Sequence, residues 1–80
     1  MRLDKYLKIS RLIKRRTVAN EACDAGKILV NGKIARASYD VKIGDVIKIN
    51  LSAKTLKIAI LQVCEYVKKE DAAKLYQVLD

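Results

Sequence analysis

The sequence predicts an α+β fold in which two N-terminal helices pack on a small, mostly antiparallel sheet, followed by a C-terminal helix. Three observations lead to this prediction: apolar residues recur at helical spacing before residue 26, β-rich segments with two turn motifs follow, and helical spacing returns after residue 67. With 80 residues, 51% hydrophobic and 32% charged, the chain has the length and composition of one ordered domain over residues 1–80.

The first helix is expected within residues 2–10. Leu3, Tyr6 and Leu7 stand at positions i, i+3 and i+4, which places them on one face of a helix. We therefore expect Tyr6 in the core rather than on the surface. Residues 11–13 would then connect this helix to the next.

A second helix is expected over residues 15–25. Its apolar residues follow the spacing of one buried stripe. They are Val18, Ala19, Ala22 and Cys23. Gly26 stands where a helix commonly ends in a left-handed residue, so the helix is predicted to stop there.

The periodicity then changes to that of strands. Residues 28–30 and 33–36 flank Asn31-Gly32, which is a strong hairpin motif. A second group of β-formers surrounds Gly44-Asp45: Val41, Ile43, Val46, Ile47 and Ile49. Residues 56–64 combine alternation with a continuous apolar patch and are predicted to form a further strand.

A closing helix is expected over residues 68–79. Its apolar residues recur at helical spacing: Ala72, Leu75, Tyr76 and Leu79. Glu70 and Asp71 near its start suit the positive end of the helix dipole. A strand and a helix would therefore fill residues 54–79.

Positive charge is concentrated in the first half of the chain. Seventeen Lys and Arg residues against nine Asp and Glu residues give a net charge of +8. Residues 1–36 hold ten basic and three acidic residues, a net of +7, whereas residues 37–80 hold seven and six, a net of +1. A domain this basic is typical of proteins that bind polyanions or acidic membrane surfaces.

Seven cations within the first sixteen positions are opposed only by Asp4. They are Arg2, Lys5, Lys8, Arg11, Lys14, Arg15 and Arg16. A face that serves only solubility usually mixes both signs, whereas these cations repel one another. Several also stand at the starts of the two helices, where the helix dipole disfavours positive charge. A bound anionic ligand would offset this cost, so we interpret the seven as candidate binding residues.

The residue inventory argues against an enzyme. Histidine is absent, so a Cys-His or Ser-His nucleophile pair is excluded, and the three glycines are isolated rather than part of a phosphate loop. Cys23 and Cys64 lie far apart without a CxxC motif, which predicts reduced core cysteines and no metal or cofactor. No apolar stretch reaches the length of a membrane span, so we expect a soluble, cytoplasmic protein without a membrane or small-molecule partner.

Structured nucleic acid is the ligand that this inventory favours. Phe and Trp are absent and the four tyrosines are scattered, so no aromatic platform for stacking single-stranded bases is expected. Lys and Arg contacts to phosphates would read shape rather than sequence. Two alternatives stay open. One is a helix-turn-helix DNA regulator, against which Glu21 and Asp24 count because they would lie near phosphates, and the other is a basic module that binds an acidic protein.

Three segments together resemble the S4 RNA-binding domain: RLDKYL, KRRTVANEACDAGKILVNGKI and VKIGDVIKI. The resemblance covers residues 2–49 and implies the S4-like (alpha-L) fold, in which two helices on a small curved sheet present a basic surface to folded RNA. The residues that match this surface by position are Arg2, Lys5, Lys8, Arg15 and Arg16. Asp4 matches an acidic family residue whose implied role is to orient neighbouring basic side chains.

Among stand-alone S4 proteins, the chain is similar to a small ribosome-associated heat-shock family and, more closely, to a family of bacterial ribosome quality-control factors. The heat-shock proteins carry a long basic C-terminal extension, and the end of this sequence at Asp80 favours the quality-control family. This resemblance implies binding to ribosomal RNA of the large subunit and to peptidyl-tRNA. It also implies a partner protein that adds C-terminal alanine tails to stalled nascent chains.

Overall fold

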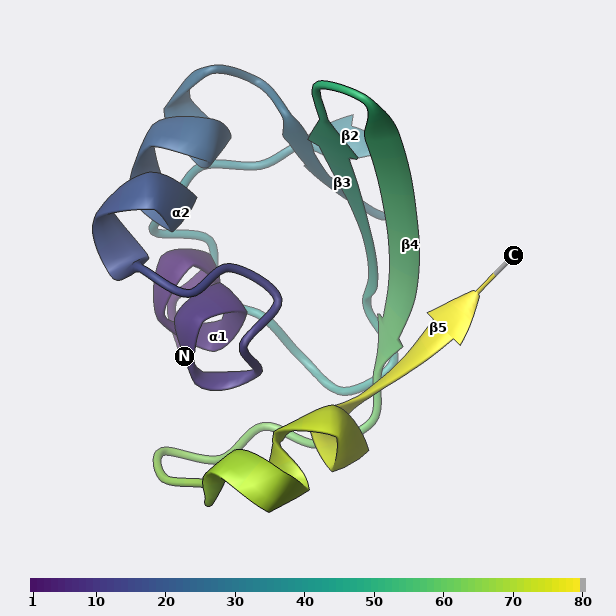
Figure 1. Ribbon diagram of the computed structural model, residues 1–80. Helices are drawn as coiled ribbons and strands as arrows, with labels where there is room; N and C mark the ends of the chain where they lie inside the picture. The colour runs from purple at the N-terminus through teal and green to yellow at the C-terminus, as the bar shows by residue number, and fades with distance from the viewer. Residues whose placement is uncertain (80) are drawn as a thin grey trace.

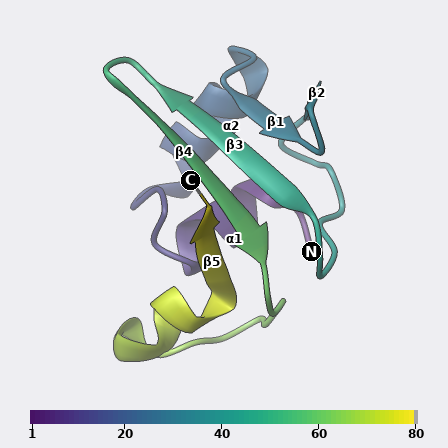
Figure 2. The same cartoon turned by 90° about the vertical axis from the view of Figure 1, so that its right-hand side faces the viewer.

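The computed structural model describes residues 1–79, which form a layer of two α-helices against an antiparallel sheet (Figure 1). The five strands follow the order β2-β1-β3-β4-β5. The elements are α1 (Leu3–Ile9), α2 (Arg16–Asp24), β1 (Ile28–Val30), β2 (Lys33–Ile34), β3 (Val46–Leu51), β4 (Lys54–Ile60), the 3-10 helix η1 (Lys69–Leu75) and β5 (Tyr76–Leu79). Figure 2 shows the sheet from the side opposite the two α-helices. The predicted α+β fold class is confirmed.

Both α-helices bury the face that the apolar spacing predicts, with one exception. The buried apolar residues are Leu3, Tyr6 and Leu7 of α1 and Ala19, Ala22 and Cys23 of α2. Val18 is 47% exposed, so its predicted place in the buried stripe is wrong. The reason is geometric, because a helix turns by about 100° per residue and Val18 therefore lies at the edge of the stripe.

The hairpin predicted at Asn31-Gly32 joins β1 to β2. Asn31 has a φ of 52° and Gly32 a φ of 84°, and a tight turn with both central residues at positive φ matches the right-handed twist of the strands. Gly26 follows α2 with a φ of 74°, which confirms the predicted left-handed end of that helix.

β1 matches its predicted range, but two extended segments predicted after Asn31-Gly32 are shorter or missing. β2 ends at Ile34 rather than residue 36. Residues 41–43 join no strand, because the backbone near them is held by the N-terminus. The Leu3 amide donates to the Tyr39 carbonyl (2.8 Å), and the Val41 amide donates to the Met1 carbonyl (2.9 Å).

The C-terminal segment departs most from the prediction. A continuous helix over residues 68–79 is wrong, because η1 ends at Leu75 and Tyr76–Leu79 forms β5. β5 pairs antiparallel with β4, from Lys57 opposite Leu79 to Ile60 opposite Tyr76. The sheet therefore gains a strand where the sequence predicted helix.

The buried Leu75 explains this change. Its carbonyl accepts hydrogen bonds from the Tyr6 hydroxyl (2.9 Å) and from the amides of Leu61 (2.8 Å) and Gln62 (3.1 Å). These partners take the place of the helical amide that would continue η1. The same bonds turn the chain after Ile60, so β4 ends four residues before the predicted end of the strand. β4 also begins at Lys54, two residues before the predicted start.

One hydrophobic cluster joins the helical layer to the sheet. Its largest fully buried apolar members are Leu3, Tyr6, Leu7, Ile28, Ile47, Ile49, Ile58, Ile60 and Leu75. The predicted core position of Tyr6 is confirmed. Both cysteines are free; Cys23 is buried as predicted, whereas Cys64 is only partly buried. None of the helices within residues 1–79 has the length and apolar character that crossing a membrane requires.

Candidate nucleic-acid interface

α1 and the loop after it position the first of the predicted basic residues. Leu3 and Leu7 bury one face of α1, which leaves Lys5 half-buried and Lys8 exposed on the other side. Arg11 stands in the loop with a φ of 63°, a left-handed conformation that is uncommon outside glycine. The Arg11 amide donates to the Lys8 carbonyl (3.1 Å), which turns the chain back toward the start of α2.

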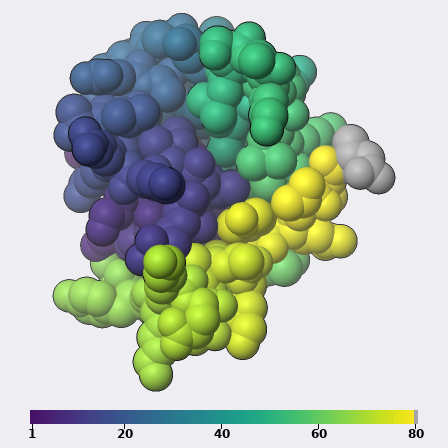
Figure 3. Space-filling view, viewed as in Figure 1, coloured from purple at the N-terminus to yellow at the C-terminus, as the bar shows by residue number. Residues whose placement is uncertain are grey.

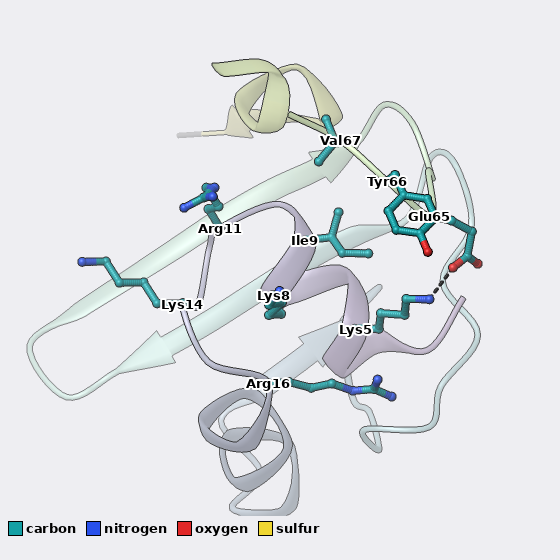
Figure 4. Close-up of a pocket in the computed structure, with 9 residues that line it drawn as sticks. All are labelled: Lys5, Lys8, Ile9, Arg11, Lys14, Arg16, Glu65, Tyr66 and Val67. Atoms are coloured by element: carbon teal, nitrogen blue, oxygen red, sulfur yellow. Dashed lines mark hydrogen bonds and ion pairs between the residues drawn. The ribbon is translucent and has the colours of Figure 1, made fainter. Parts of the chain in front are cut away.

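Five of the seven predicted basic residues line one pocket of about 540 Å³ (Figure 4). They are Lys5, Lys8, Arg11, Lys14 and Arg16, and we call the cavity that they line the basic pocket. The other lining residues are Ile9, Glu65, Tyr66 and Val67. In Figure 4, Arg11 and Lys14 extend to one side of the pocket. Lys5 and Arg16 extend toward the side on which Glu65 lies.

Arg2 and Arg15 do not line the basic pocket. Arg2 precedes α1 and lines a neighbouring depression that it shares with Asn20, Asp24 and Arg36. Arg15 is exposed at the N-cap of α2. Five of the seven cations therefore form one central group, and Arg2 and Arg15 lie outside it.

The start of α2 carries the unfavourable charge that the sequence predicts. Arg15 makes no side-chain capping hydrogen bond, Arg16 is the first helical residue, and the first turn contains no acidic residue. Positive charge here is disfavoured by the helix dipole. The carboxylate of Asp4 in α1 offsets part of this positive charge, because it lies 3.4 Å from Arg16 Nε.

Asp4 is buried between the two helices and contacts both. Its carboxylate accepts hydrogen bonds from Arg2 Nε (3.2 Å), Asn20 Nδ2 (3.3 Å) and the Lys5 amide (2.8 Å), in addition to its ion pair with Arg16. Burial alone would raise the pKa of Asp4, but the hydrogen bonds from Arg2, Asn20 and Arg16 lower it below its usual value. The carboxylate is therefore ionised at neutral pH and holds guanidinium groups at the starts of both helices.

Glu65 and Tyr66 are pocket residues that the sequence analysis missed. Lys5 forms an ion pair with Glu65, 60 positions later in the chain, and this contact holds the pKa of Glu65 below its usual value. Tyr66 is 95% exposed at the same edge of the pocket. No local pattern links these residues to α1, so sequence periodicity gave no signal for them.

Two observations concern metal ligands and the buried cysteine of the described residues. Within residues 1–79, no group of three His, Cys, Asp or Glu side chains is placed to hold a metal ion. Burial, followed by the charges of Asp4 and Asp24, raises the pKa of the Cys23 thiol to about 11, so this cysteine is a poor nucleophile. The chemistry that the site supports is the binding of anions.

Comparison with known proteins gives the family. The family model of the S4 domain matches residues 1–47. The chain is 51% identical over 79 residues to the RQC P-site tRNA stabilizing factor of Streptococcus pneumoniae, an alignment that covers 99% of this chain and 90% of that protein. It is 48% identical over 79 residues to the protein of the same name from Bacillus subtilis, with 99% and 92% of the two chains covered.

A solved structure supports the same assignment. Heat Shock Protein 15 of Vibrio cholerae superposes with a TM-score of 0.91 at 30% sequence identity, over 99% of this chain and 81% of that chain. The S4-like fold and the resemblance to quality-control factors, which the sequence motifs predict, are both confirmed. Because the family model matches more than half of its length and close relatives align along nearly all of it, the chain belongs to the S4 domain family.

Proposed function

We propose that this chain is a non-enzymatic RNA-binding protein that acts in the cytoplasm, in the ribosome quality control of stalled nascent chains. It binds folded ribosomal RNA of the large subunit together with the adjacent peptidyl-tRNA. A partner protein that adds C-terminal alanine tails acts beside it. Relatives that are about half identical and are named as P-site tRNA stabilizing factors support the tRNA and quality-control parts of this proposal.

The basic pocket is the observation that carries the proposal. Five cations surround one hollow, and Glu65 is the one acidic residue among its lining residues. Cations gathered in this way repel one another, and the repulsion is relieved when anions bind between them. RNA phosphates are spaced along a backbone and match a set of Lys and Arg side chains that spans two helices.

Asp4 would prepare two arginines for this contact. Its carboxylate occupies the Nε side of Arg2 and of Arg16. A guanidinium has five donors, so each arginine keeps donors for a phosphate while its orientation is fixed. In this proposal Asp4 orients Arg2 and Arg16 without touching RNA, and Arg15 extends the surface at the exposed start of α2.

Charge reversal in the basic pocket tests the proposal. Lys8→Glu and Lys14→Glu are suitable variants, because neither lysine is in an ion pair within residues 1–79. Arg16→Glu is less suitable, since it would place a second carboxylate beside Asp4. We expect each lysine variant to bind isolated large ribosomal subunits at least about tenfold more weakly than the wild type, as measured by co-sedimentation.

Lys57→Glu is the matched control. Lys57 is exposed and alternates with Ile58 and Ile60, which face the helices, so its side chain lies on the other face of the sheet. We expect this variant to bind the subunits as the wild type does. Wild-type binding by folded Lys8→Glu and Lys14→Glu proteins would contradict the proposed surface. Preferred binding to duplex DNA, or complexes that survive nuclease treatment, would favour a DNA regulator or a protein-binding module instead.

A further inference from the structure

Tyr66 is the most exposed large hydrophobic residue of the described chain. Its exposed fraction is 95%, whereas the neighbouring Val63, Cys64 and Val67 pack against the core. The backbone of this segment is therefore anchored, while the side chains of Glu65 and Tyr66 are exposed at the surface. A single exposed aromatic residue needs no functional explanation, so its surroundings decide whether it has a role.

Those surroundings are the basic pocket. Tyr66 lines it together with Lys5, Lys8 and Ile9 of α1. The ion pair between Lys5 and Glu65 ties the residue next to Tyr66 to α1. Figure 4 shows the tyrosine ring beside Glu65 at this edge of the pocket, and Figure 3 shows the light-green atoms of this region next to the purple atoms of α1.

We propose that Tyr66 stacks on an unpaired base of the RNA whose phosphates the basic pocket holds. This inference rests on the proposed RNA-binding function and adds a contact to it. Proteins read loops and bulges of folded RNA by stacking splayed bases on aromatic rings while cations hold the adjacent phosphates. Tyr66 supplies such a ring beside cations, and Ile9 and Val67 supply apolar surface around it.

The charge of the surroundings favours RNA over a protein as the occupant. An exposed tyrosine also suits protein interfaces, but those are depleted of lysine. Here the ring lies at the edge of a pocket lined by five cations and by one carboxylate, Glu65, which is already paired with Lys5. A nucleotide satisfies both halves of this site, because its phosphate binds the cations and its base covers the ring.

Paired substitutions at one position test the inference. Tyr66→Phe keeps an aromatic ring, whereas Tyr66→Leu keeps an apolar side chain without one. Because one stacked base contributes about 1–3 kcal/mol, we expect Tyr66→Leu to bind isolated large ribosomal subunits about five- to a hundredfold more weakly. Tyr66→Phe should bind like the wild type. Ultraviolet cross-linking to the same subunits, read by mass spectrometry, should attach a nucleotide to Tyr66.

The outcomes separate this inference from the proposed function. Wild-type binding by Tyr66→Leu, together with lost binding by Lys8→Glu, would overturn stacking and leave the basic pocket as the RNA site. Equal losses in Tyr66→Phe and Tyr66→Leu would overturn stacking in favour of a hydroxyl contact. Wild-type binding by both Lys8→Glu and Lys14→Glu would remove the proposed function and this inference with it. Unchanged melting temperatures are expected, since Tyr66 is almost fully exposed.

Discussion

Asp4 offsets unfavourable positive charge at the starts of both α1 and α2. Arg2 is the N-cap of α1 and Arg16 is the first residue of α2, so both lie where a helix dipole repels cations. The buried Asp4 carboxylate lies 3.2 Å from Arg2 Nε and 3.4 Å from Arg16 Nε. A single acidic side chain thus stabilises two arginines and links the helices that carry the basic pocket.

We expect Asp4→Asn to lower the free energy of unfolding by about 1.5–3 kcal/mol at neutral pH, because hydrogen bonds to a charged group are lost. The folded pKa of Asp4 lies below its unfolded value, so its contribution is present above about pH 4 and is lost as pH falls through the folded pKa. The difference between the wild type and Asp4→Asn should therefore shrink below about pH 4. Urea denaturation across pH measures both effects.

Glu21→Gln is the control for this measurement, because Glu21 is exposed on α2 and forms no ion pair within the described chain. Its unfolding free energy should stay within about 0.5 kcal/mol of the wild type. Equal stability of Asp4→Asn and the wild type at neutral pH would show that the carboxylate does not hold the helices together.

At the start of α2, the residues that lower helix stability are also residues that we propose bind RNA. A helix N-cap usually has a Ser, Thr, Asp or Asn side chain that accepts a backbone hydrogen bond. Arg15 occupies this position and makes no such bond, and the first turn has no acidic residue. The helix forms through packing of its buried alanines, while its first residues stay available to an anionic ligand.

Arg15→Ser should stabilise the free protein and weaken its binding to RNA. A serine cap with one cation removed is expected to raise the free energy of unfolding by about 1 kcal/mol. Binding to isolated large subunits should fall, since a residue that we propose contacts phosphate is lost. Arg15→Ala removes the charge without adding a cap, so it should show the same loss of binding with a smaller gain in stability. Lower stability of Arg15→Ser, or unchanged binding, would contradict this account.

Local elements were predictable because nearby residues decide them. The spacing of Leu3, Tyr6 and Leu7 predicts α1, and Asn31-Gly32 predicts the first hairpin. Both elements depend on residues that are close to one another in the sequence. Five of the seven cations line one pocket because α1, the loop after it and the start of α2 follow one another in the chain, whereas Arg2 and Arg15 lie outside that pocket. Their role in binding stays a prediction.

Elements decided by distant contacts were not predictable. The apolar spacing over residues 72–79 fits a helix, but the Leu75 carbonyl bonds to Tyr6 and Leu61, so the chain turns and pairs with β4. Tyr66 lies at the basic pocket next to Glu65, whose ion pair with Lys5 spans 60 positions. Periodicity within one segment carries no information about either contact.

Over the whole molecule, the two faces of the sheet differ in what covers them. The helical layer covers one face (Figure 1), and residues of its two helices and of the loop between them form most of the lining of the basic pocket. On the other face Lys48 and Lys57 lie directly opposite each other in the β3–β4 register, with Leu29 beside Lys48 and Leu79 beside Lys57. Most of the excess positive charge of residues 1–36 lies on the helical side of the sheet. The salt dependence of binding should therefore measure phosphate contacts made on that side.

If the five cations of the basic pocket each neutralise a phosphate, log affinity should fall with log salt concentration with a slope of roughly −3.5 to −4.5. Raising salt from about 50 to 200 mM would then weaken binding to isolated large subunits by about a hundred- to five-hundredfold. Lys8→Gln should flatten the slope by about one unit, whereas Lys57→Gln should leave it unchanged. A slope near zero would exclude phosphate contacts as the source of affinity.

The same titration separates stacking from charge. A base stacked on Tyr66 releases no counterions, so Tyr66→Leu should lower the affinity at every salt concentration without changing the slope. Lys8→Gln should lose most of its disadvantage at high salt, because the contact that it removes is already screened there. Parallel lines for the wild type and Tyr66→Leu, with a converging line for Lys8→Gln, would assign one part of the binding energy to the aromatic ring and another to the cations. A slope change in Tyr66→Leu would instead mean that the tyrosine acts by positioning Lys5 through the neighbouring Glu65.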